Sequence, residues 1–488
     1  MSIVSELKSG FRAQLSSQAV SSIVGGVLTV VLARLLTPNE YGLFFLTISI
    51  FSFFKVFTRL GIARSAGRYI AEYKEEKPDQ IPHIIRTAAA VNSVTVGIAV
   101  IVLIVGHQQI AELVRQPELA PLLLFGVVYL SFTTFATFLS KVWQGFEAIT
   151  LASIITICSQ VGRLVFSVGF VVAGFGAMGA LGGYTVATSI PVVIGTVILY
   201  RNYYAVGESV SAVESGLRRR IIEYSIPITA TNTADRIDKQ IDTILIGFFL
   251  SPVAVGQYVI GKKVVKFIET PMNAVGFTLS PTFGAQKAEG NITRASRIYE
   301  VALSHILLLY IPAGAGMILV ADPFVRLFFG SDYSGAVPVL QVLGVFAVLK
   351  AVTKLSGNGL DFLGRARSRA IAKTVTSVLN VVLNVALIPT VGIVGAALAT
   401  VVTYSFYTLF TLYIITQEFE LDLRGLLGRM ARICVVTAIM STVVVVFLER
   451  IEGWITLFVV VGLAVAVWAV LSVLTGLLDI QRVKSMLV

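Results

Sequence analysis

The sequence predicts an all-α integral membrane protein, because two features of its composition argue against other classes. Of its 488 residues, 56% are hydrophobic and only 13% are charged, whereas soluble domains contain about 25% charged residues. The hydrophobic residues gather in runs of about 20, the length that an α-helix needs to cross the hydrocarbon core of a bilayer. At about 20 residues per crossing, the apolar content allows at most about 14 crossings.

The apolar runs predict about 14 transmembrane helices: six in the first half of the chain, six in a second series and two near the C-terminus. The first six are expected near residues 15–36, 41–65, 87–106, 119–142, 149–173 and 177–200. The others are expected near residues 221–249, 254–281, 298–320, 335–359, 366–388, 392–415, 429–448 and 454–478. We therefore predict a six-helix lobe over 1–210, a second six-helix lobe over 211–418, and two extra helices over 419–488.

Basic residues in the loops predict the orientation. Lys and Arg concentrate in alternate loops, and the loops of the opposite side hold only Arg115, Arg326 and Arg450. Since cytoplasmic loops carry an excess of Lys and Arg, both termini are expected in the cytoplasm. This topology accounts for the net charge of +11 without nucleic acid as a partner, and the basic and aromatic stripe of nucleic-acid binders is missing.

Few residues of the chain suit metal or redox chemistry. The two cysteines, Cys158 and Cys434, lie in apolar runs, and the three histidines, His83, His107 and His305, lack the spacing of zinc ligands. The predicted outward loops are too short to form a catalytic domain. We therefore expect no catalytic residues, no metal and no cofactor, and we expect that the protein is not an enzyme.

Two pairs of similar segments indicate an internal repeat. Residues 35–42 read LLTPNEYG and residues 249–256 read FLSPVAVG; further on, residues 176–180 read GAMGA and residues 392–396 read GIVGA. Each copy holds six predicted crossings, an even number, so the lobes are expected to share one orientation, related by a pseudo-twofold axis along the membrane normal. Two such parallel halves are typical of transporters that work by alternating access.

These segments also carry a resemblance to a known family. Residues 25–42, the basic stretch 64–77, and the repeat at 176–180 and 392–396 make the chain resemble the polysaccharide-export branch of the multidrug, oligosaccharidyl-lipid and polysaccharide exporter superfamily. The resemblance implies a 14-helix fold and a prokaryotic flippase of the cytoplasmic membrane. It also implies that the cargo is a lipid-linked glycan on polyprenyl phosphate or pyrophosphate. Implied partners are membrane lipids and the glycan polymerase or glycosyltransferases of the same pathway.

The seventh predicted helix is unusually rich in charge. It carries Asp235, Arg236, Asp238, Lys239 and Asp242, and ionisable residues within a membrane normally face a cavity or a partner. We interpret Arg236 and Lys239 as substrate-binding candidates and the three aspartates as coupling-ion candidates. Internal pairing of Asp235 with Lys239, four residues apart, is an equally weighted alternative. Sodium, protons and the membrane potential all stay open as the energy source.

Three basic pairs at a spacing of four residues complete the predicted substrate site. Like charges on one helical face repel each other, so each pair suggests an anion between its members, and a lipid phosphate or pyrophosphate fits the implied cargo. The pairs are Lys55 with Arg59, Lys262 with Lys266, and Lys350 with Lys354. Two alternatives stay open: extension of Lys and Arg to the headgroups, and pairing of Lys266 with Glu269.

Polar side chains elsewhere in the apolar helices are weaker candidates for binding sugar hydroxyls, and hydrogen bonding between helices is the preferred reading for them. They are Gln14, Gln18, Gln160, Arg163, Asn380 and Asn384.

The sequence thus favours a flippase that binds an anionic headgroup and leaves the lipid tail in the bilayer. A cation-coupled multidrug exporter is the alternative, because Asp235, Asp238 and Asp242 suit a cationic substrate while the basic pairs do not. An integral-membrane glycan polymerase or ligase ranks third, since it needs acid, base or phosphate-binding groups on a substantial outward loop.

Overall fold

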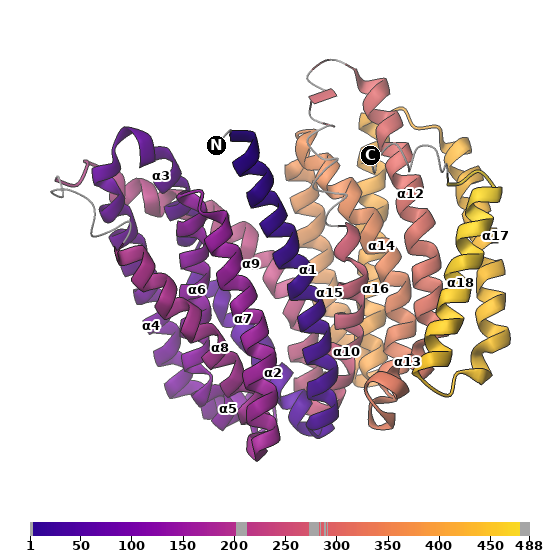
Figure 1. Ribbon diagram of the computed structural model, residues 1–488, viewed down its shortest axis with the longest axis horizontal. Helices are drawn as coiled ribbons and strands as arrows, with labels where there is room; N and C mark the ends of the chain where they lie inside the picture. The colour runs from indigo at the N-terminus through magenta and orange to yellow at the C-terminus, as the bar shows by residue number, and fades with distance from the viewer. Residues whose placement is uncertain are drawn as a thin grey trace. The chain divides into compact units, whose positions relative to one another are not determined.

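The structure, a computed structural model, describes residues 3–201, 212–272, 283, 285–286, 289 and 291–478. The side chains of residues 3–16, 227–228 and 230–238 lie outside this description. The described residues fold almost entirely into helices and include no β-strand (Figure 1). They form two compact units, unit 1 over Met1–Gly256 and unit 2 over Gln257–Val488.

Unit 1 is a bundle in which α7 packs along both α1 and α8, α6 contacts α3 and α8, and α9 packs against α2. Its helices are α1 (Ile3–Leu35), α2 (Pro38–Arg59), α3 (Ile62–Glu76), η1 (Pro78–Gln80), α4 (Ile81–Leu113), α5 (Leu119–Phe125), α6 (Val127–Gly145), α7 (Ile149–Phe170), η2 (Val171–Phe175), α8 (Gly176–Leu199) and α9 (Leu217–Phe249).

Unit 2 is built around α14, which packs against α12 and α16. α10 (Pro252–Ile268) begins in unit 1 and continues into unit 2. The other helices of unit 2 are α12 (Ile292–Leu319), α13 (Ala321–Phe328), η4 (Ser331–Tyr333), α14 (Ala336–Phe362), α15 (Ala366–Val391), α16 (Ile393–Glu418), α17 (Leu423–Phe447), η5 (Leu448–Arg450) and α18 (Trp454–Leu474).

The helices confirm the predicted all-α membrane class. Each of the predicted crossings overlaps a described helix. Among the described residues, ten helical segments are long and apolar enough to cross a membrane, and the bent pair α5 and α6 would make eleven. The full number of crossings, the lobe boundaries and the pseudo-twofold axis remain predictions.

One predicted crossing, near residues 41–65, ends earlier than expected. Helix α2 stops at Arg59, and the chain turns through Leu60 and Gly61, whose φ angles of 25° and 64° lie in the left-handed region. Glycine adopts this conformation without steric cost. Gly61 therefore allows α3 to leave α2 at once in a new direction.

The first repeated motif forms a close contact inside unit 1. Thr37 caps α2 through a capping box with Glu40, and Pro38 occupies its first turn. A Cβ atom on Gly42 would lie only 1.7 Å from the backbone oxygen of Pro252, and one on Gly256 would lie 3.0 Å from the Tyr41 ring. The glycine that ends each copy of the motif is thus needed where the two copies meet.

The second repeated motif has the same local geometry in both copies. Gly176 and Gly392 begin their segments with φ angles of 50° and 71°. Three residues later, a Cβ atom on Gly179 would clash with the backbone of Phe170, and one on Gly395 would clash with the backbone of Leu387. Each copy therefore folds a helix tightly back on the helix before it.

The contact at Gly42 predicts a difference between two glycine substitutions. Gly42→Ala places a methyl group against backbone that cannot move away, so we expect a loss of at least about 1 to 3 kcal/mol in stability. Gly25→Ala is the matched control, because a Cβ atom there meets nothing within 4 Å. Melting temperatures in detergent should fall for Gly42→Ala only, and equal values would contradict this packing role.

A polar cluster anchors the start of α9 to α3 and η1. The Glu214 carboxylate accepts hydrogen bonds from Lys77 Nζ at 3.0 Å, Arg220 Nη2 at 2.6 Å and the Tyr73 hydroxyl at 3.2 Å. The Glu214 N–H donates to Gln80 Oε1 at 2.9 Å. The bonds from Lys77 and Arg220 hold the pKa of Glu214 below its usual range.

This lowered pKa predicts a pH-dependent stability. A carboxylate with a lowered folded pKa stabilises the protein above its unfolded pKa of about 4.3, and the contribution is lost as the pH falls through the folded value. Glu214→Gln should therefore lower the melting temperature at pH 7, and the difference from the wild type should shrink towards pH 3. A difference that is constant with pH would contradict an ionic anchor.

A candidate anion-binding cavity

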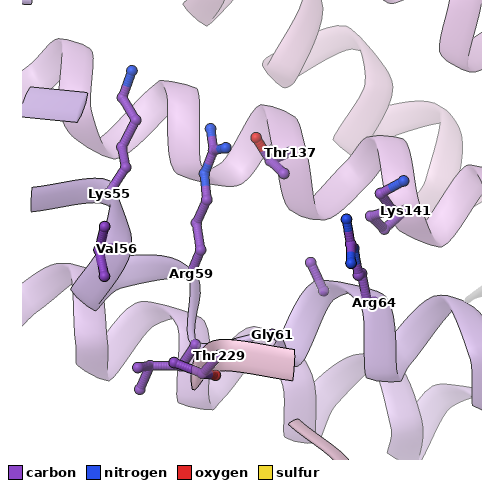
Figure 2. Close-up of a pocket in the computed structure, with 10 residues that line it drawn as sticks. Lys55, Val56, Arg59, Gly61, Arg64, Thr137, Lys141 and Thr229 are labelled. Atoms are coloured by element: carbon purple, nitrogen blue, oxygen red, sulfur yellow. The ribbon is translucent and has the colours of Figure 1, made fainter. Parts of the chain in front are cut away.

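A cavity of about 110 Å³ lies in unit 1, beside the break between α2 and α3. It holds four basic side chains, and none of the residues described as lining it is acidic (Figure 2). The lining consists of Lys55, Val56, Arg59, Leu60, Gly61, Ala63, Arg64, Thr137, Lys141 and Thr229. We call this hollow the basic cavity.

Three helices contribute the four cations. Figure 2 shows the side chains of Lys55 and Arg59, one turn apart on α2, extending in the same direction, with Arg64 of α3 and Lys141 of α6 across from them. The turn at Gly61 places Arg64 near the end of α2. Helices α3 and α6 approach closely there, because a Cβ atom on Gly67 would lie 2.6 Å from the backbone oxygen of Lys141.

The two predicted residues of this group, Lys55 and Arg59, have their side chains inside the protein. Lys55 is 8% exposed, and its Nζ atom lies 4.9 Å from the centroid of the Tyr129 ring, a cation–π contact. Arg59 Nη2 donates to the backbone oxygen of Thr133 at 3.3 Å. A buried ammonium over an aromatic face does not fit the alternative in which Lys55 extends to lipid headgroups.

The cavity carries an excess of positive charge. Arg64 and Lys141 repel each other, and neither forms an ion pair with a described residue. The first N–H groups of α3 add partial positive charge, since its N-cap residue, Gly61, supplies no capping side chain. The described lining therefore favours an anion, because it brings four basic side chains together and includes no carboxylate.

The chemistry and size of the basic cavity suit a phosphate. Arginine binds phosphate through paired, charge-assisted hydrogen bonds, and lysine adds a mobile point charge. A water molecule requires about 10 to 15 Å³ of cavity volume. The basic cavity, at about 110 Å³, therefore holds several waters or a phosphate-sized group. Pockets that enclose whole drug-sized ligands measure about 300 to 1,000 Å³. An oligosaccharide would therefore lie outside this cavity.

The charged residues predicted on α9 are described only in part. The side chains of Asp235, Arg236 and Asp238 lie outside the described residues. Lys239 is exposed, whereas Asp242 is only 5% exposed. Their roles in binding substrate or a coupling ion remain predictions.

The other two predicted pairs belong to unit 2. Lys262 lies over the Tyr258 ring at 5.5 Å, and Lys266 is exposed. Lys350 forms an ion pair of 2.5 Å with Glu269, the carboxylate that the sequence suggested for Lys266. The exposed Lys354 acts electrostatically on Asp361, which pairs with Arg369 at 2.8 Å. Lys350 is thus already paired with a carboxylate of unit 2.

Of the two predicted amide side chains in unit 2, Asn384 bonds to Asn380 within α15, and Asn380 joins α15 to α16. Asn384 Nδ2 donates to Asn380 Oδ1 at 2.9 Å, and Asn380 Nδ2 donates to Thr403 Oγ1 on α16 at 3.4 Å. This geometry agrees with hydrogen bonding between helices. In unit 1, Gln18 is exposed, the side chain of Gln14 lies outside the description, and Gln160 accepts a hydrogen bond from Arg163.

Sequence analysis missed Arg64 and Lys141 as site residues. Both lie in segments assigned to the cytoplasm, so Lys141 counted only towards the topology and Arg64 only as part of a basic stretch. The available signal was Gly61, two residues after Arg59, because a glycine there can end the helix and let the chain change direction. Lys141 gave no signal, since only tertiary packing brings α6 to this point.

Comparisons with known proteins agree with this fold. A family model described as polysaccharide biosynthesis protein matches residues 7–286, and a MatE family model matches residues 227–386. The chain is 25% identical over 353 residues to the lipopolysaccharide biosynthesis protein WzxC of Escherichia coli K12, covering 71% of this chain and 67% of WzxC.

Two further similarities cover different lengths. The probable low-salt glycan biosynthesis flippase Agl15 of Haloferax volcanii is 29% identical over 181 residues, covering 37% of this chain and 38% of Agl15. The structure of the lipid II flippase MurJ in an inward closed conformation superimposes with a TM-score of 0.76 and 16% identity, covering 95% of this chain and 98% of MurJ. At that identity, the second similarity establishes the fold.

The ion pair in unit 2 predicts how its substitutions combine. Lys350→Met leaves Glu269 uncompensated, so we expect a loss of about 1.5 to 3 kcal/mol in stability. Replacing both residues with apolar ones of similar size, Lys350→Met and Glu269→Leu, should restore much of this loss. Thermal unfolding of the two single variants and the double variant measures the coupling. Independent effects would contradict the pair and return Lys350 to the candidate substrate ligands.

Proposed function

The chain belongs to the polysaccharide biosynthesis protein family, and from that premise we propose that it is a flippase for a lipid-linked oligosaccharide or polysaccharide precursor. The cargo would be carried on polyprenyl phosphate or pyrophosphate and would cross the cytoplasmic membrane by alternating access. The observation that supports this most strongly is the basic cavity, in which four cations gather around a phosphate-sized hollow whose described lining contains no carboxylate.

We expect the phosphate, the polyprenyl tail and the glycan of the cargo to lie in different places. The phosphate or pyrophosphate binds Lys55, Arg59, Arg64 and Lys141, and the hydroxyl of Thr137 is available for a further hydrogen bond. The polyprenyl tail stays in the bilayer, because its transfer into water would be unfavourable. The glycan extends from the phosphate beyond the cavity, so the protein recognises the linkage more than the sugar.

The alternative of a cation-coupled multidrug exporter has less support. Its substrates are usually cations, and they would require carboxylates in the binding cavity. The MatE match over residues 227–386 fits that alternative as well as it fits a flippase. The described lining of the basic cavity repels a cation, so a flippase accounts for unit 1 better.

An enzyme is a poorer fit, because the relatives are named as flippases and biosynthesis proteins and the fold is shared with transporters. We propose that the cargo crosses without chemical change. The glycan polymerase or glycosyltransferases of the same pathway would act before and after it, and both termini would face the cytoplasm.

The remaining charged residues keep proposed roles. Asp235, Asp238 and Asp242 are candidates for binding the coupling ion. The candidates for additional contacts with the anionic cargo are Arg236, Lys239, Lys262, Lys266 and Lys354.

Removal of one charge from the basic cavity tests the proposal. Arg59→Gln removes charge-assisted hydrogen bonds of about 1.5 to 3 kcal/mol. The dissociation constant for farnesyl pyrophosphate should therefore rise roughly 10- to 100-fold. Calorimetry of the purified protein measures this constant. In proteoliposomes, the same variant should flip a fluorescent polyprenyl pyrophosphate-linked sugar at least about tenfold more slowly.

Two further variants separate charge from general damage. Arg59→Lys keeps the charge and should retain intermediate binding. Arg326→Gln removes an equal charge from an exposed pair with Asp322 and should bind and flip as the wild type does. Wild-type binding and flipping by Arg59→Gln, or uptake of ethidium in place of lipid flipping, would overturn the proposal.

A further inference from the structure

A fifth cation, Arg163, lies deep in unit 1, away from the residues that line the basic cavity. It is half-buried on α7, 14 residues beyond the first residue, Ile149. At about 1.5 Å per residue, this places it roughly 21 Å along the helix. The basic cavity lies near the start of α7. One of its residues, Lys141, is four residues before the end of α6, the helix that precedes α7.

The guanidinium of Arg163 is held in place but not neutralised. Its Nη1 donates to Gln160 Oε1 at 3.0 Å, and its Cζ lies 5.0 Å from the centroid of the Tyr184 ring on α8. The Nε atom is buried and has no hydrogen-bond partner among the described residues. No described carboxylate forms an ion pair with it. Most of the five N–H donors of this side chain therefore remain available.

The helices around Arg163 offer almost no negative charge. Tyr184 contacts Phe44 of α2 and Tyr129 of α6, so the side chain of Arg163 is directed towards the helices of unit 1. Helices α6, α7 and α8 contain no Asp or Glu, α2 contains only Glu40, and α1, which packs along α7, contains only Glu6, near its first residue. Glu40 is bound in the capping box at the start of α2. A charge in this position is unfavourable unless an anion visits it.

A pair of tyrosines connects Arg163 with the basic cavity. Lys55 Nζ lies 4.9 Å from the Tyr129 centroid, the two tyrosine centroids are 6.0 Å apart, and Arg163 Cζ lies 5.0 Å from the Tyr184 centroid. Lys55 and Arg163 are therefore at most about 16 Å apart, by these three distances. Lys55 and Lys141 each lie four residues before the end of their helices, whereas Arg163 lies 14 residues into α7, so Arg163 is the deeper position.

We propose that Arg163 is a second anion-binding subsite, which receives the phosphate or pyrophosphate of the cargo after it leaves the basic cavity. This inference rests on the proposed flippase function and adds a direction to it. The anion passes from four cations to one, so it is held less tightly at the deeper position. Weaker binding there favours release on the far side of the membrane.

A purely structural role accounts poorly for Arg163. Its hydrogen bond to Gln160 stays within α7 and joins no second helix. Helices α7 and α8 already meet through Gly162 against Ala187 and through the Ser167 hydroxyl, which donates to the backbone oxygen of Ala180 at 3.0 Å. The contact of Arg163 with the Tyr184 ring does join α7 to α8, but a cation–π contact contributes only about 0.5 to 1 kcal/mol at exposed sites. Its loss is offset by the removal of a charge with no described ion pair, so neutralising Arg163 should change the melting temperature little.

The test compares Arg163→Gln and Arg163→Lys with the wild type in three measurements. Farnesyl pyrophosphate binding to the purified protein should change less than twofold for Arg163→Gln, since the basic cavity is intact. Flipping of a fluorescent polyprenyl pyrophosphate-linked sugar in proteoliposomes should fall at least tenfold. Arg163→Lys should recover a substantial part of the rate, and neither variant should lose thermal stability.

Three results would overturn the subsite. Unchanged flipping by Arg163→Gln would show that the cargo does not need Arg163. Loss of farnesyl pyrophosphate binding as large as that caused by Arg59→Gln would place both residues in one site. A fall in both melting temperature and flipping, without recovery in Arg163→Lys, would show a structural role.

Chemical protection identifies the ligand and is independent of transport. Phenylglyoxal modifies accessible arginines, and mass spectrometry reports the extent of modification at Arg163. Farnesyl pyrophosphate should protect Arg163 in vesicles of phosphatidylcholine, with inorganic pyrophosphate protecting at higher concentration. Equal protection by phosphatidylglycerol alone would assign the subsite to ordinary lipid headgroups and overturn the link to cargo.

This readout also distinguishes the two proposals. If the wild type fails to flip any lipid-linked sugar but pyrophosphate protects Arg163, the proposed function is wrong and an anion subsite is supported. If the wild type flips the cargo and Arg163 is not protected, the subsite is wrong and the flippase remains.

Discussion

The gathering of four basic side chains around one hollow is the feature on which the proposed site in unit 1 depends. Lys55, Arg59, Arg64 and Lys141 share one small hollow whose described lining contains no carboxylate. Like charges held close together repel one another, so an anion between them would stabilise the group. In unit 2, by contrast, Lys350 pairs with Glu269. We therefore interpret the four cations of the basic cavity as ligands for an anion and the pair of Lys350 with Glu269 as structural.

The breaks between helices make this concentration of charge possible. The turn at Gly61 ends α2 beside the cavity and directs α3 back, so that Arg64 reaches the cations of α2. A second break at Gly126 bends α5 and α6 by 44°, and the absence of a side chain there leaves room for the Phe51 ring. Aromatic residues fill the space between the helices, and Tyr129 places a ring face against Lys55. Glycines and aromatic rings thus shape the described surroundings of the four cations.

The sequence predicted the helices well because each crossing is a long apolar run, and hydropathy reports burial in lipid directly. The repeated turns were also predicted, because residues such as Thr37 and Pro38 mark the start of a helix in the sequence itself. The site was predicted only in part. Lys55 and Arg59 stood out as like charges on one helical face, whereas Lys141 reaches them only through the packing of α3 on α6. The partner of Lys350 was missed because Glu269 lies 81 positions away on another helix.

An experimental structure with farnesyl pyrophosphate bound would test the central claim most directly. The account predicts density for the pyrophosphate within hydrogen-bonding distance of Arg59, Arg64 and Lys141, with the apolar chain leaving towards the lipid. A carboxylate side chain found in that hollow, or pyrophosphate bound only elsewhere on the protein, would contradict the claim that these cations are there to bind an anionic cargo.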